Sequence, residues 1–157
     1  MKSITCFSPA KINLTLDIFP KESEADFHKL ETVYHLIDFG DDIQISFSNR
    51  FEIEGDFDCK TEDNLIYRAW ELMCDFFGEK SLSPVKVLVY KRIPTGGGLG
   101  GGSSNVASFV QSYFELAGLG KVPFELIEIL GNLGKDIPFF FLEHNCGFGR
   151  RFGEVVD

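Results

Sequence analysis

Histidine, cysteine and basic residues are scarce in this sequence, and each scarcity disfavours a class of function. His35 and His144 lie far apart and beside no acidic or cysteine cluster, so a histidine-based metal site is not expected. The four cysteines form no C-x-x-C pair, and the N-terminus lacks the apolar core of a signal peptide. These two observations favour a reducing cytoplasm as the expected compartment.

Positive charge is also in deficit. Lysine and arginine total 15 against 24 acidic residues, which gives a formal charge of −9 and a pI near 4.8. Nucleic acid and anionic membranes attract proteins through a broad basic field, so neither is an expected partner. The longest aromatic run, residues 139–142, is far too short to span a bilayer. An anionic substrate would need local cations, for which the candidates are Lys11, Lys91, Arg92, Arg150 and Arg151.

Apolar residues are plentiful enough for a packed core. The 157 residues are 44% hydrophobic and 14% aromatic, which is sufficient for one globular domain. No internal repeat or low-complexity segment interrupts the chain apart from one glycine-rich stretch. We therefore expect a single domain over residues 1–157.

The glycine-rich stretch, residues 91–107, organises the rest of the chain. It follows an alternating segment at Val85, Val87 and Val89, which predicts a strand, and it opens a helix. The apolar face of that helix comprises Val106, Phe109, Val110, Tyr113, Phe114 and Ala117. Glycines before a helix N-terminus let backbone N–H groups surround an anion, and the helix dipole favours negative charge there. We therefore expect this loop to bind phosphate.

The glycine pattern alone is a weak signal. G-x-G-x-x-G fits Gly96, Gly98 and Gly101, but a run so rich in glycine matches it easily by chance. Gly102 stands where a Walker A loop requires lysine, so P-loop chemistry is excluded at this position. The Rossmann pattern is not continued, because a second helix follows where a strand ending in an acidic residue is needed. The plainer alternative is a flexible linker, which the flanking Ile-Pro and the patterned helix disfavour.

Polar residues at three other places have both a functional and a structural interpretation. Alternation over residues 11–18 predicts a strand whose polar face carries Lys11 and Asn13, and the pattern alone favours an ordinary solvated face over a functional one. Asn64 is placed to cap a helix that Gly78 ends. Asp136 lies beside a proline and apolar residues, where a cap or a turn is the alternative to a functional role.

The remaining segments are expected to be scaffold. Residues 43–47 and 51–54 alternate and predict a hairpin through residues 48–50, and residues 32–38 are expected to be extended. Pro123 is expected to begin a short helix that ends at Gly131, and Gly118 is expected to cap the helix before it.

Three stretches resemble motifs of the GHMP small-molecule kinases. Residues 93–105, Ile-Pro-x-Gly-Gly-Gly-Leu-Gly-Gly-Gly-Ser-Ser-Asn, resemble the second motif of that family. Residues 8–14, Ser-Pro-Ala-Lys-Ile-Asn-Leu, resemble its first motif, and residues 133–140 resemble its Gly-x-Asp-Val-Pro-Phe segment. Similarity at residues 27–32 and 62–69 extends the match over nearly the whole chain. The expanded glycine loop is most similar to that of the subgroup that phosphorylates 4-diphosphocytidyl-2-C-methyl-D-erythritol.

The resemblance implies a fold and an activity. The fold is α+β, that of the GHMP-kinase N-terminal domain (ribosomal protein S5 domain 2-like), with a mostly antiparallel sheet and helices on one face. The activity is ATP-dependent phosphorylation of the 2-hydroxyl of that substrate in the non-mevalonate isoprenoid pathway, with ATP and Mg²⁺ as cofactors. The resembled kinases continue into a C-terminal GHMP domain that is expected to be absent from residues 1–157. The alternatives are a truncated, catalytically inactive nucleotide-binding domain and a GHMP kinase with another small alcohol acceptor.

The resemblance also implies roles for individual residues. Asp136 would accept the proton of the substrate hydroxyl, and Lys11 would stabilise the resulting charge. Asn13, Phe27 and His28 would bind the acceptor, whose cytosine ring would stack on Phe27. The cofactor-binding residues would be Asn64, Lys91, Pro94, Thr95, Gly96, Gly97, Gly98, Leu99, Gly100, Gly101, Gly102, Ser103 and Ser104. Ser103 or Ser104 would help to hold Mg²⁺, and no dedicated metal site is expected. The expected partner is the small-molecule substrate, and a homodimer is left open.

The chain departs from the family pattern at three places. Residues 25–28 read Ala-Asp-Phe-His where Asp-Gly-Tyr-His is usual, which keeps an aromatic ring for stacking but removes one hydroxyl. Lys135 stands where small residues are usual, and its ammonium could pair with Asp136. Residues 150–154 read Arg-Arg-Phe-Gly-Glu in place of Glu-Gly-x-Gly-Glu.

Overall fold

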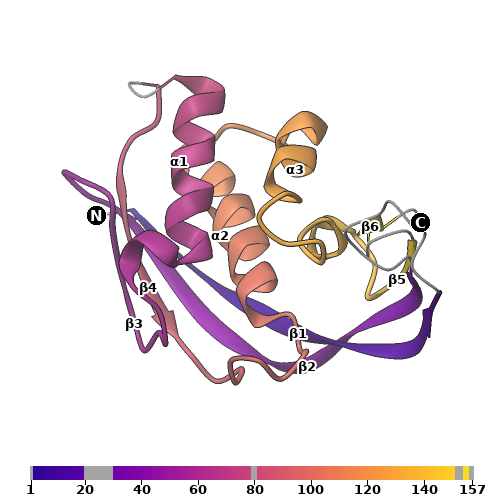
Figure 1. The fold of residues 1–157 in the computed structure, drawn as a ribbon. Coiled ribbons are helices and arrows are strands. Elements are labelled where there is room, and N and C mark those ends of the chain that lie inside the picture. The colour runs from indigo at the N-terminus through magenta and orange to yellow at the C-terminus, as the bar shows by residue number, and fades with distance from the viewer. Residues whose placement is uncertain (1, 20–29, 79–80, 151–153, 156–157) are drawn as a thin grey trace.

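The computed structural model describes residues 2–19, 30–78, 81–150 and 154–155. These residues form a curved six-stranded sheet with three α-helices against one face (Figure 1). The strands are β1 (Ser3–Ile18), β2 (Leu30–Phe47), β3 (Glu52–Gly55), β4 (Val85–Tyr90), β5 (Cys146–Arg150) and β6 (Glu154–Val155). The helices are α1 (Leu65–Phe77), α2 (Gly101–Ala117) and α3 (Phe124–Leu130), with short 3₁₀ turns η1 (Thr61–Asp63) and η2 (Pro138–Phe141). The expected α+β class is confirmed.

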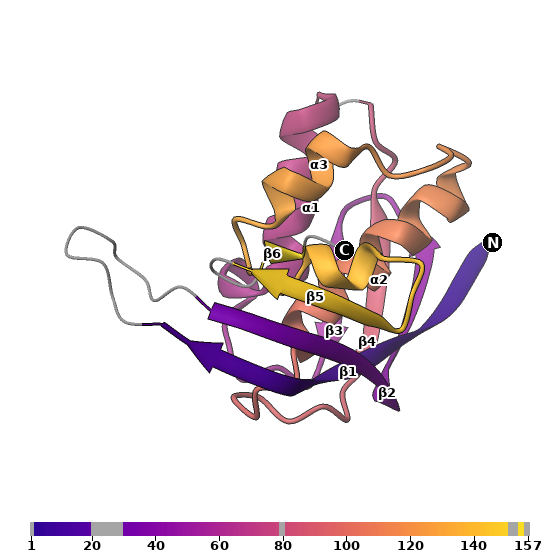
Figure 2. The same cartoon turned by 90° about the vertical axis from the view of Figure 1, so that its right-hand side faces the viewer.

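The long strand β2 organises the sheet. On one side it pairs antiparallel with β1 over almost its whole length. On the other side residues 32–35 pair with β5 and residues 42–47 pair with β4, so these two strands share one edge of β2 (Figure 2). Among the described strands only β3 and β4 pair in parallel, and the expectation of a mostly antiparallel sheet is therefore confirmed.

The expected hairpin between residues 43–47 and 51–54 is wrong. Strand β4 lies between β2 and β3, and β3 pairs with β4 so that Glu52 stands opposite Lys86. Parallel neighbours need a crossover, and α1 supplies it between β3 and β4. Both segments do alternate as strands, but alternation does not determine which strand lies next to which.

The helices begin and end where local sequence signals predict. The Asn64 side chain accepts a hydrogen bond from the backbone N–H of Ile66 and so caps α1, which ends before Gly78. Helix α2 ends at Gly118 in a left-handed conformation, and α3 starts directly after Pro123. Within the described part of the chain, none of these helices has the length and apolar character needed to cross a membrane.

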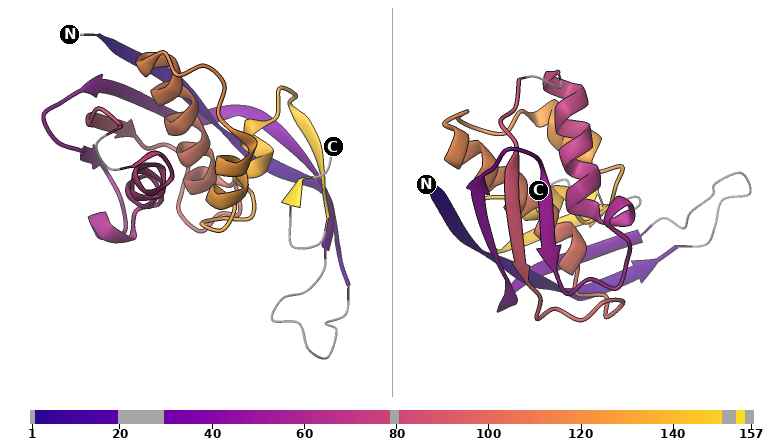
Figure 3. Two further views of the ribbon diagram at one scale, coloured as in Figure 1. Left: turned by 90° about the horizontal axis from the view of Figure 1, so that it is seen from above. Right: turned by 90° about the vertical axis from the view of Figure 1, so that its left-hand side faces the viewer.

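Two hydrophobic clusters hold the helices on the sheet. The larger lies between α1, α2 and the half of the sheet that contains β4. Figure 3 shows from above how these helices lie against the sheet. Its largest fully buried side chains include Ile43, Ile45, Ile66, Met73, Val85, Val87, Phe109 and Tyr113. The smaller cluster consists of Tyr34, Ala107, Phe139 and Phe140. It joins β2, α2 and η2, and it therefore fixes the segment that contains Asp136 next to the sheet.

Strand β1 extends with β2 into an arm that reaches beyond the helices (Figure 2). The predicted strand over residues 11–18 is confirmed, but its burial does not follow the alternation, because both faces are exposed from Ile12 onward and only Lys11 is buried. Ile12, Leu14, Leu16 and Ile18 are 36–63% exposed, whereas Lys11 is only 5% exposed. Irregular register at residues 9–10 and 13–15 changes the direction of side chains along the strand. An ordinary solvated face therefore does not describe Lys11.

Candidate active site

The glycine-rich stretch forms a loop between β4 and the N-terminus of α2. Gly96, Gly98 and Gly100 have φ angles of +76°, +71° and +71°, which side chains rarely tolerate. A Cβ on Gly96 or Gly98 would meet no atom within 4 Å, so the loop is open there. A Cβ on Gly100 would lie 3.0 Å from Phe140 and 3.1 Å from Lys11, so the loop packs closely against the rest of the site at that point.

A cavity of about 260 Å³ lies beside this loop. Residues 93–102 and Lys91 form one part of its lining, the glycine wall. Residues 56–59 and 63–66 form most of the rest, and they include the carboxylates of Asp56, Asp58 and Asp63. The N-terminus of α2 borders the glycine wall, where unpaired N–H groups and the helix dipole favour an anion. The cavity therefore combines a glycine wall suited to an anion with a second part that mixes apolar side chains, the Asn64 amide and three carboxylates.

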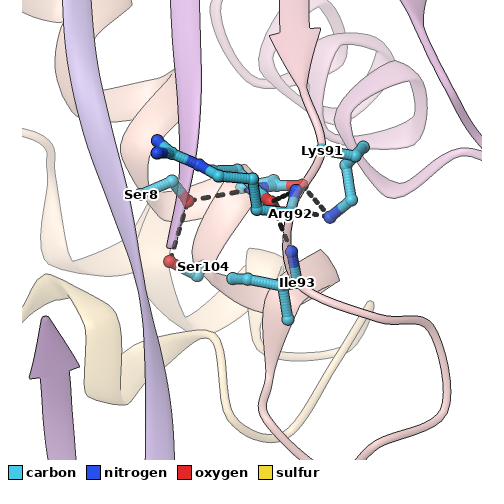
Figure 4. A network of polar contacts seen from close by, with 7 residues as sticks. Ser8, Lys91, Arg92, Ile93 and Ser104 are labelled. Carbon is cyan, nitrogen blue, oxygen red and sulfur yellow. Dashed lines mark hydrogen bonds and ion pairs between the residues drawn. The ribbon is translucent and has the colours of Figure 1, made fainter. Parts of the chain in front are cut away.

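A buried carboxylate anchors the start of the loop, and Figure 4 labels three of its partners, Lys91, Arg92 and Ile93. Asp41 on β2 is completely buried and accepts hydrogen bonds from the backbone N–H groups of Arg92 (2.6 Å) and Ile93 (2.8 Å). Its other oxygen accepts from Lys91 Nζ (2.6 Å) and from Asn105 Nδ2 (2.8 Å). Burial alone would raise the pKa of Asp41, but the hydrogen bonds from Ile93, Lys91, Arg92 and Asn105 outweigh it and hold the pKa below its usual value.

The same network reaches the first turns of α2. Asn105 accepts a hydrogen bond from Lys91 Nζ at 3.0 Å and donates one to the Ser8 hydroxyl at 2.9 Å, and the hydroxyls of Ser8 and Ser104 lie 2.8 Å apart. The Ser104 hydroxyl is therefore directed into the protein interior. Ser103 is half-buried, and neither serine is among the residues that line the cavity. Lys91 still lines the cavity, although its ammonium is already bonded to two partners.

Three predicted site residues meet at the other end of the loop. The Nζ of Lys11 lies 3.3 Å from Oδ2 of Asp136 and donates to Oδ1 of Asn13 at 2.8 Å. The Lys11 side chain is 6% exposed and that of Asp136 is 28% exposed, so the carboxylate remains accessible. The backbone N–H of Lys11 donates to the carbonyl of Leu99 at 2.9 Å, which joins this group to the glycine loop.

Surrounding side chains fix the orientation of this group. Asn13 Nδ2 donates to the Thr32 hydroxyl at 2.7 Å, and that buried hydroxyl donates to the carbonyl of Thr15 at 2.6 Å. The hydroxyl of Tyr34 donates to Oδ1 of Asp136 at 2.9 Å. Burial, together with the charge and hydrogen bond of Asp136, raises the pKa of Tyr34 above its usual value, so the hydroxyl keeps its proton at neutral pH.

Other predicted positions are placed differently or not at all. Phe27 and His28 lie outside the described residues. Lys135 is exposed, and in the described part of the chain the ion pair of Asp136 is with Lys11. Among the described residues no group of three or more His, Cys, Asp or Glu side chains could hold a metal ion.

Sequence reasoning missed Asp41 and Tyr34. Asp41 stands beside Asp42 in the sequence, yet Asp41 is completely buried and the Asp42 side chain is 44% exposed. Nothing local distinguishes the two, because the donors that stabilise Asp41 come from the loop after β4 and from α2. In the sequence Tyr34 is one aromatic residue of an extended segment. The partner of its hydroxyl, Asp136, is distant in sequence, so no local pattern indicates this hydrogen bond.

The fold and the site together define a class of protein. An α+β domain here holds a glycine loop at a helix N-terminus, with a cavity on one side and a buried lysine paired with a carboxylate on the other. The sequence profile described as GHMP kinases N terminal domain matches residues 64–144, which is more than half of the chain. The chain therefore belongs to the GHMP kinase family.

Curated relatives share one name. The chain is 40% identical over 153 residues to the 4-diphosphocytidyl-2-C-methyl-D-erythritol kinase of a Sulfurihydrogenibium species, an alignment that covers 96% of this chain and 54% of the relative. It is 36% identical over 162 residues to the chloroplastic enzyme of that name from Mentha piperita, covering 98% of this chain and 38% of the relative. The chain thus spans about half the length, or less, of these curated relatives.

Solved structures show the same fold. A crystal structure of 4-(cytidine 5'-diphospho)-2C-methyl-D-erythritol kinase matches with a TM-score of 0.77 and 30% identity, covering 98% of this chain and 54% of the other. Homoserine kinase from Cytophaga hutchinsonii matches with a TM-score of 0.66 but only 15% identity, covering 100% of this chain and 52% of the other. The second likeness establishes the fold alone.

Proposed function

We propose that this chain is the ATP-binding domain of an enzyme that phosphorylates the 2-hydroxyl of 4-diphosphocytidyl-2-C-methyl-D-erythritol in the non-mevalonate isoprenoid pathway. The observation that carries the proposal is the 3.3 Å pair of Lys11 and Asp136, bonded through Leu99 to the glycine loop. The choice of acceptor is supported by the names of relatives at 36–40% identity.

The cavity fits a nucleoside triphosphate. The glycine wall would hold the phosphates through backbone donors, and Asn64 and Phe57, which line the rest of the cavity, would contact the remainder of the nucleotide. Mg²⁺ would be held mainly by the phosphates themselves. The uncrowded positions of Gly96 and Gly98 leave space for such close approach.

The reaction that the domain must support moves a phosphoryl group from an oxygen of ATP to an oxygen of the acceptor. ATP supplies a γ-phosphoryl group, whose bond to the bridging β–γ oxygen breaks while a bond to the acceptor oxygen forms, leaving ADP. Asp136 takes the proton that the acceptor hydroxyl loses, and its carboxylate is accessible enough to do so. The Lys11 ammonium, held by Asn13, offsets negative charge on the acceptor oxygen.

The experiment uses the protein at its natural length with ATP and a panel of alcohols that includes diphosphocytidyl-methylerythritol, homoserine and mevalonate. We expect ³¹P NMR to show a new phosphate monoester and ADP in equal amounts with the first acceptor alone. Transfer to a different alcohol would replace the proposed acceptor. ATP binding without transfer to any alcohol would leave an inactive nucleotide-binding domain as the better description.

A further inference from the structure

Tyr34 contacts both of the groups that the proposed function assigns to the reaction. It lies on β2 opposite Asn13 of β1 and is 2% exposed. Its hydroxyl donates to Oδ1 of Asp136 at 2.9 Å, and the ammonium of Lys11 lies 5.1 Å from the centre of its ring. One side chain therefore holds the carboxylate by its polar end and faces the ammonium with its ring.

The hydrogen bond restricts how the carboxylate can turn. With Oδ1 bonded to Tyr34 and Oδ2 close to Lys11, the plane of the Asp136 carboxylate is fixed at both oxygens. A general base works only when one lone pair points at the proton to be removed, and a freely rotating carboxylate would satisfy that condition for only part of the time.

The ring of Tyr34 has a separable structural role. It packs against Phe139 with ring centres 4.9 Å apart, inside the cluster that fixes the segment after Asp136. Phenylalanine would preserve this packing and the ring face below Lys11. The hydroxyl is therefore the part of Tyr34 that packing does not require.

We propose that Tyr34 is a positioning residue for phosphoryl transfer: its hydroxyl orients the Asp136 carboxylate toward the acceptor, and its ring supports the Lys11 ammonium. This role rests on the proposed function, in which Asp136 accepts the proton of the acceptor. It is separate from nucleotide binding, because Tyr34 is not among the residues that line the cavity beside the glycine loop.

The test is Tyr34→Phe in the protein at its natural length. We expect kcat to fall about tenfold, the scale of one hydrogen bond to a charged group, with KM for ATP and for the acceptor nearly unchanged. In an Asp136→Asn background the same substitution should cause no further loss, because the carboxylate that Tyr34 orients is gone.

Tyr113→Phe is the matched control. Tyr113 is also buried, and its hydroxyl donates to the carbonyl of Ser83 at 3.1 Å, far from the site. We expect it to lower the melting temperature as Tyr34→Phe does while leaving kcat unchanged. Wild-type kcat in Tyr34→Phe, or an equal loss with and without Asp136, would overturn the proposal. A wild-type protein that binds ATP but phosphorylates no acceptor would instead overturn the proposed function, and the role of Tyr34 with it.

Discussion

The backbone N–H of Lys11 donates to the carbonyl of Leu99 at 2.9 Å, so the strand that carries the ammonium is bonded directly to the glycine loop. Lys11 side-chain atoms also lie just over 3 Å from the position that a Cβ on Gly100 would take. The glycine loop and the Lys11–Asp136 pair are thus joined by direct contacts. Changes in the loop should therefore affect both nucleotide binding and transfer.

Gly100→Ala tests this coupling. The new Cβ would lie 3.0 Å from Phe140 and 3.1 Å from Lys11, at a residue whose φ is +71°. Alanine in that conformation costs about 1–2 kcal/mol, and relief of the strain would move the loop or Lys11. We expect ATP affinity measured by calorimetry to fall about tenfold or more, and kcat to fall as well.

Gly118→Ala provides the matched control at the opposite end of the same helix. Gly118 has a φ of +70°, and a Cβ there would meet no atom within 4 Å. The substitution should therefore cost similar stability while leaving ATP affinity unchanged. Equal ATP affinity in the two variants would mean that the loop around Gly100 does not hold the phosphates.

Asp136→Asn tests the choice of base. An amide keeps the shape of the side chain but cannot accept the proton, so kcat should fall about 10²–10⁴-fold with little change in either KM. Lys11→Ala should behave similarly, and the two losses should not multiply because the residues act as one unit. Lys135→Ala, at an exposed neighbour, should keep wild-type kcat in the same steady-state assay. A fully active Asp136→Asn enzyme would remove Asp136 from the mechanism.

Helix boundaries could be predicted because their signals are local. Asn64 caps α1 through an atom two residues away, and Gly118 ends α2 through its own backbone angle. Which strands pair is determined by segments distant in sequence. The alternation of residues 51–54 therefore predicts a strand, but not that β3 pairs with β4 in place of β2. Alternation likewise predicts the period of β1 but not its burial, because Lys11 is buried while Asn13 and Asp17 on the same predicted face are exposed.

Only part of the site could be predicted from the sequence, again because segments distant in sequence form it. Lys11 and Asp136 were singled out by resemblance to a family, since no spacing rule brings two residues so far apart in sequence to 3.3 Å. Asp41 and Tyr34 lay outside the motifs that carried the resemblance. Their roles depend on donors and acceptors contributed by the loop after β4, by α2 and by the turn before η2.

Phe27→Ala tests acceptor recognition at a residue that lies outside the described part of the structure. Stacking of a base on an aromatic ring contributes about 1–3 kcal/mol, so KM for the acceptor should rise about tenfold or more with a smaller effect on KM for ATP. Phe124→Ala removes another phenylalanine, 69% exposed on α3, and should change neither constant. A rise in KM for ATP with a constant acceptor KM would reverse the placement of the two ligands.

Asp41→Asn tests the buried network through the pH dependence of stability. The folded-state pKa of Asp41 lies below its usual value of 3.8, so its stabilising contribution is present above that pH and is lost as the pH falls through the folded-state pKa. Replacing it should cost about 2–4 kcal/mol of unfolding free energy near pH 7, because an amide cannot accept from all four donors.

The difference in unfolding free energy between wild type and Asp41→Asn should therefore stay constant down to about pH 5 and shrink as the pH is lowered through and below 3.8, measured by urea denaturation at each pH. Asp42→Asn is the matched control, because Asp42 is the next residue and its ion pair with Arg92 is about half exposed. Such surface pairs contribute about 0–1 kcal/mol, so this control should stay close to wild type throughout. A constant difference for Asp41→Asn across the range would show that the carboxylate's charge does not stabilise the start of the glycine loop, and that only its shape matters there.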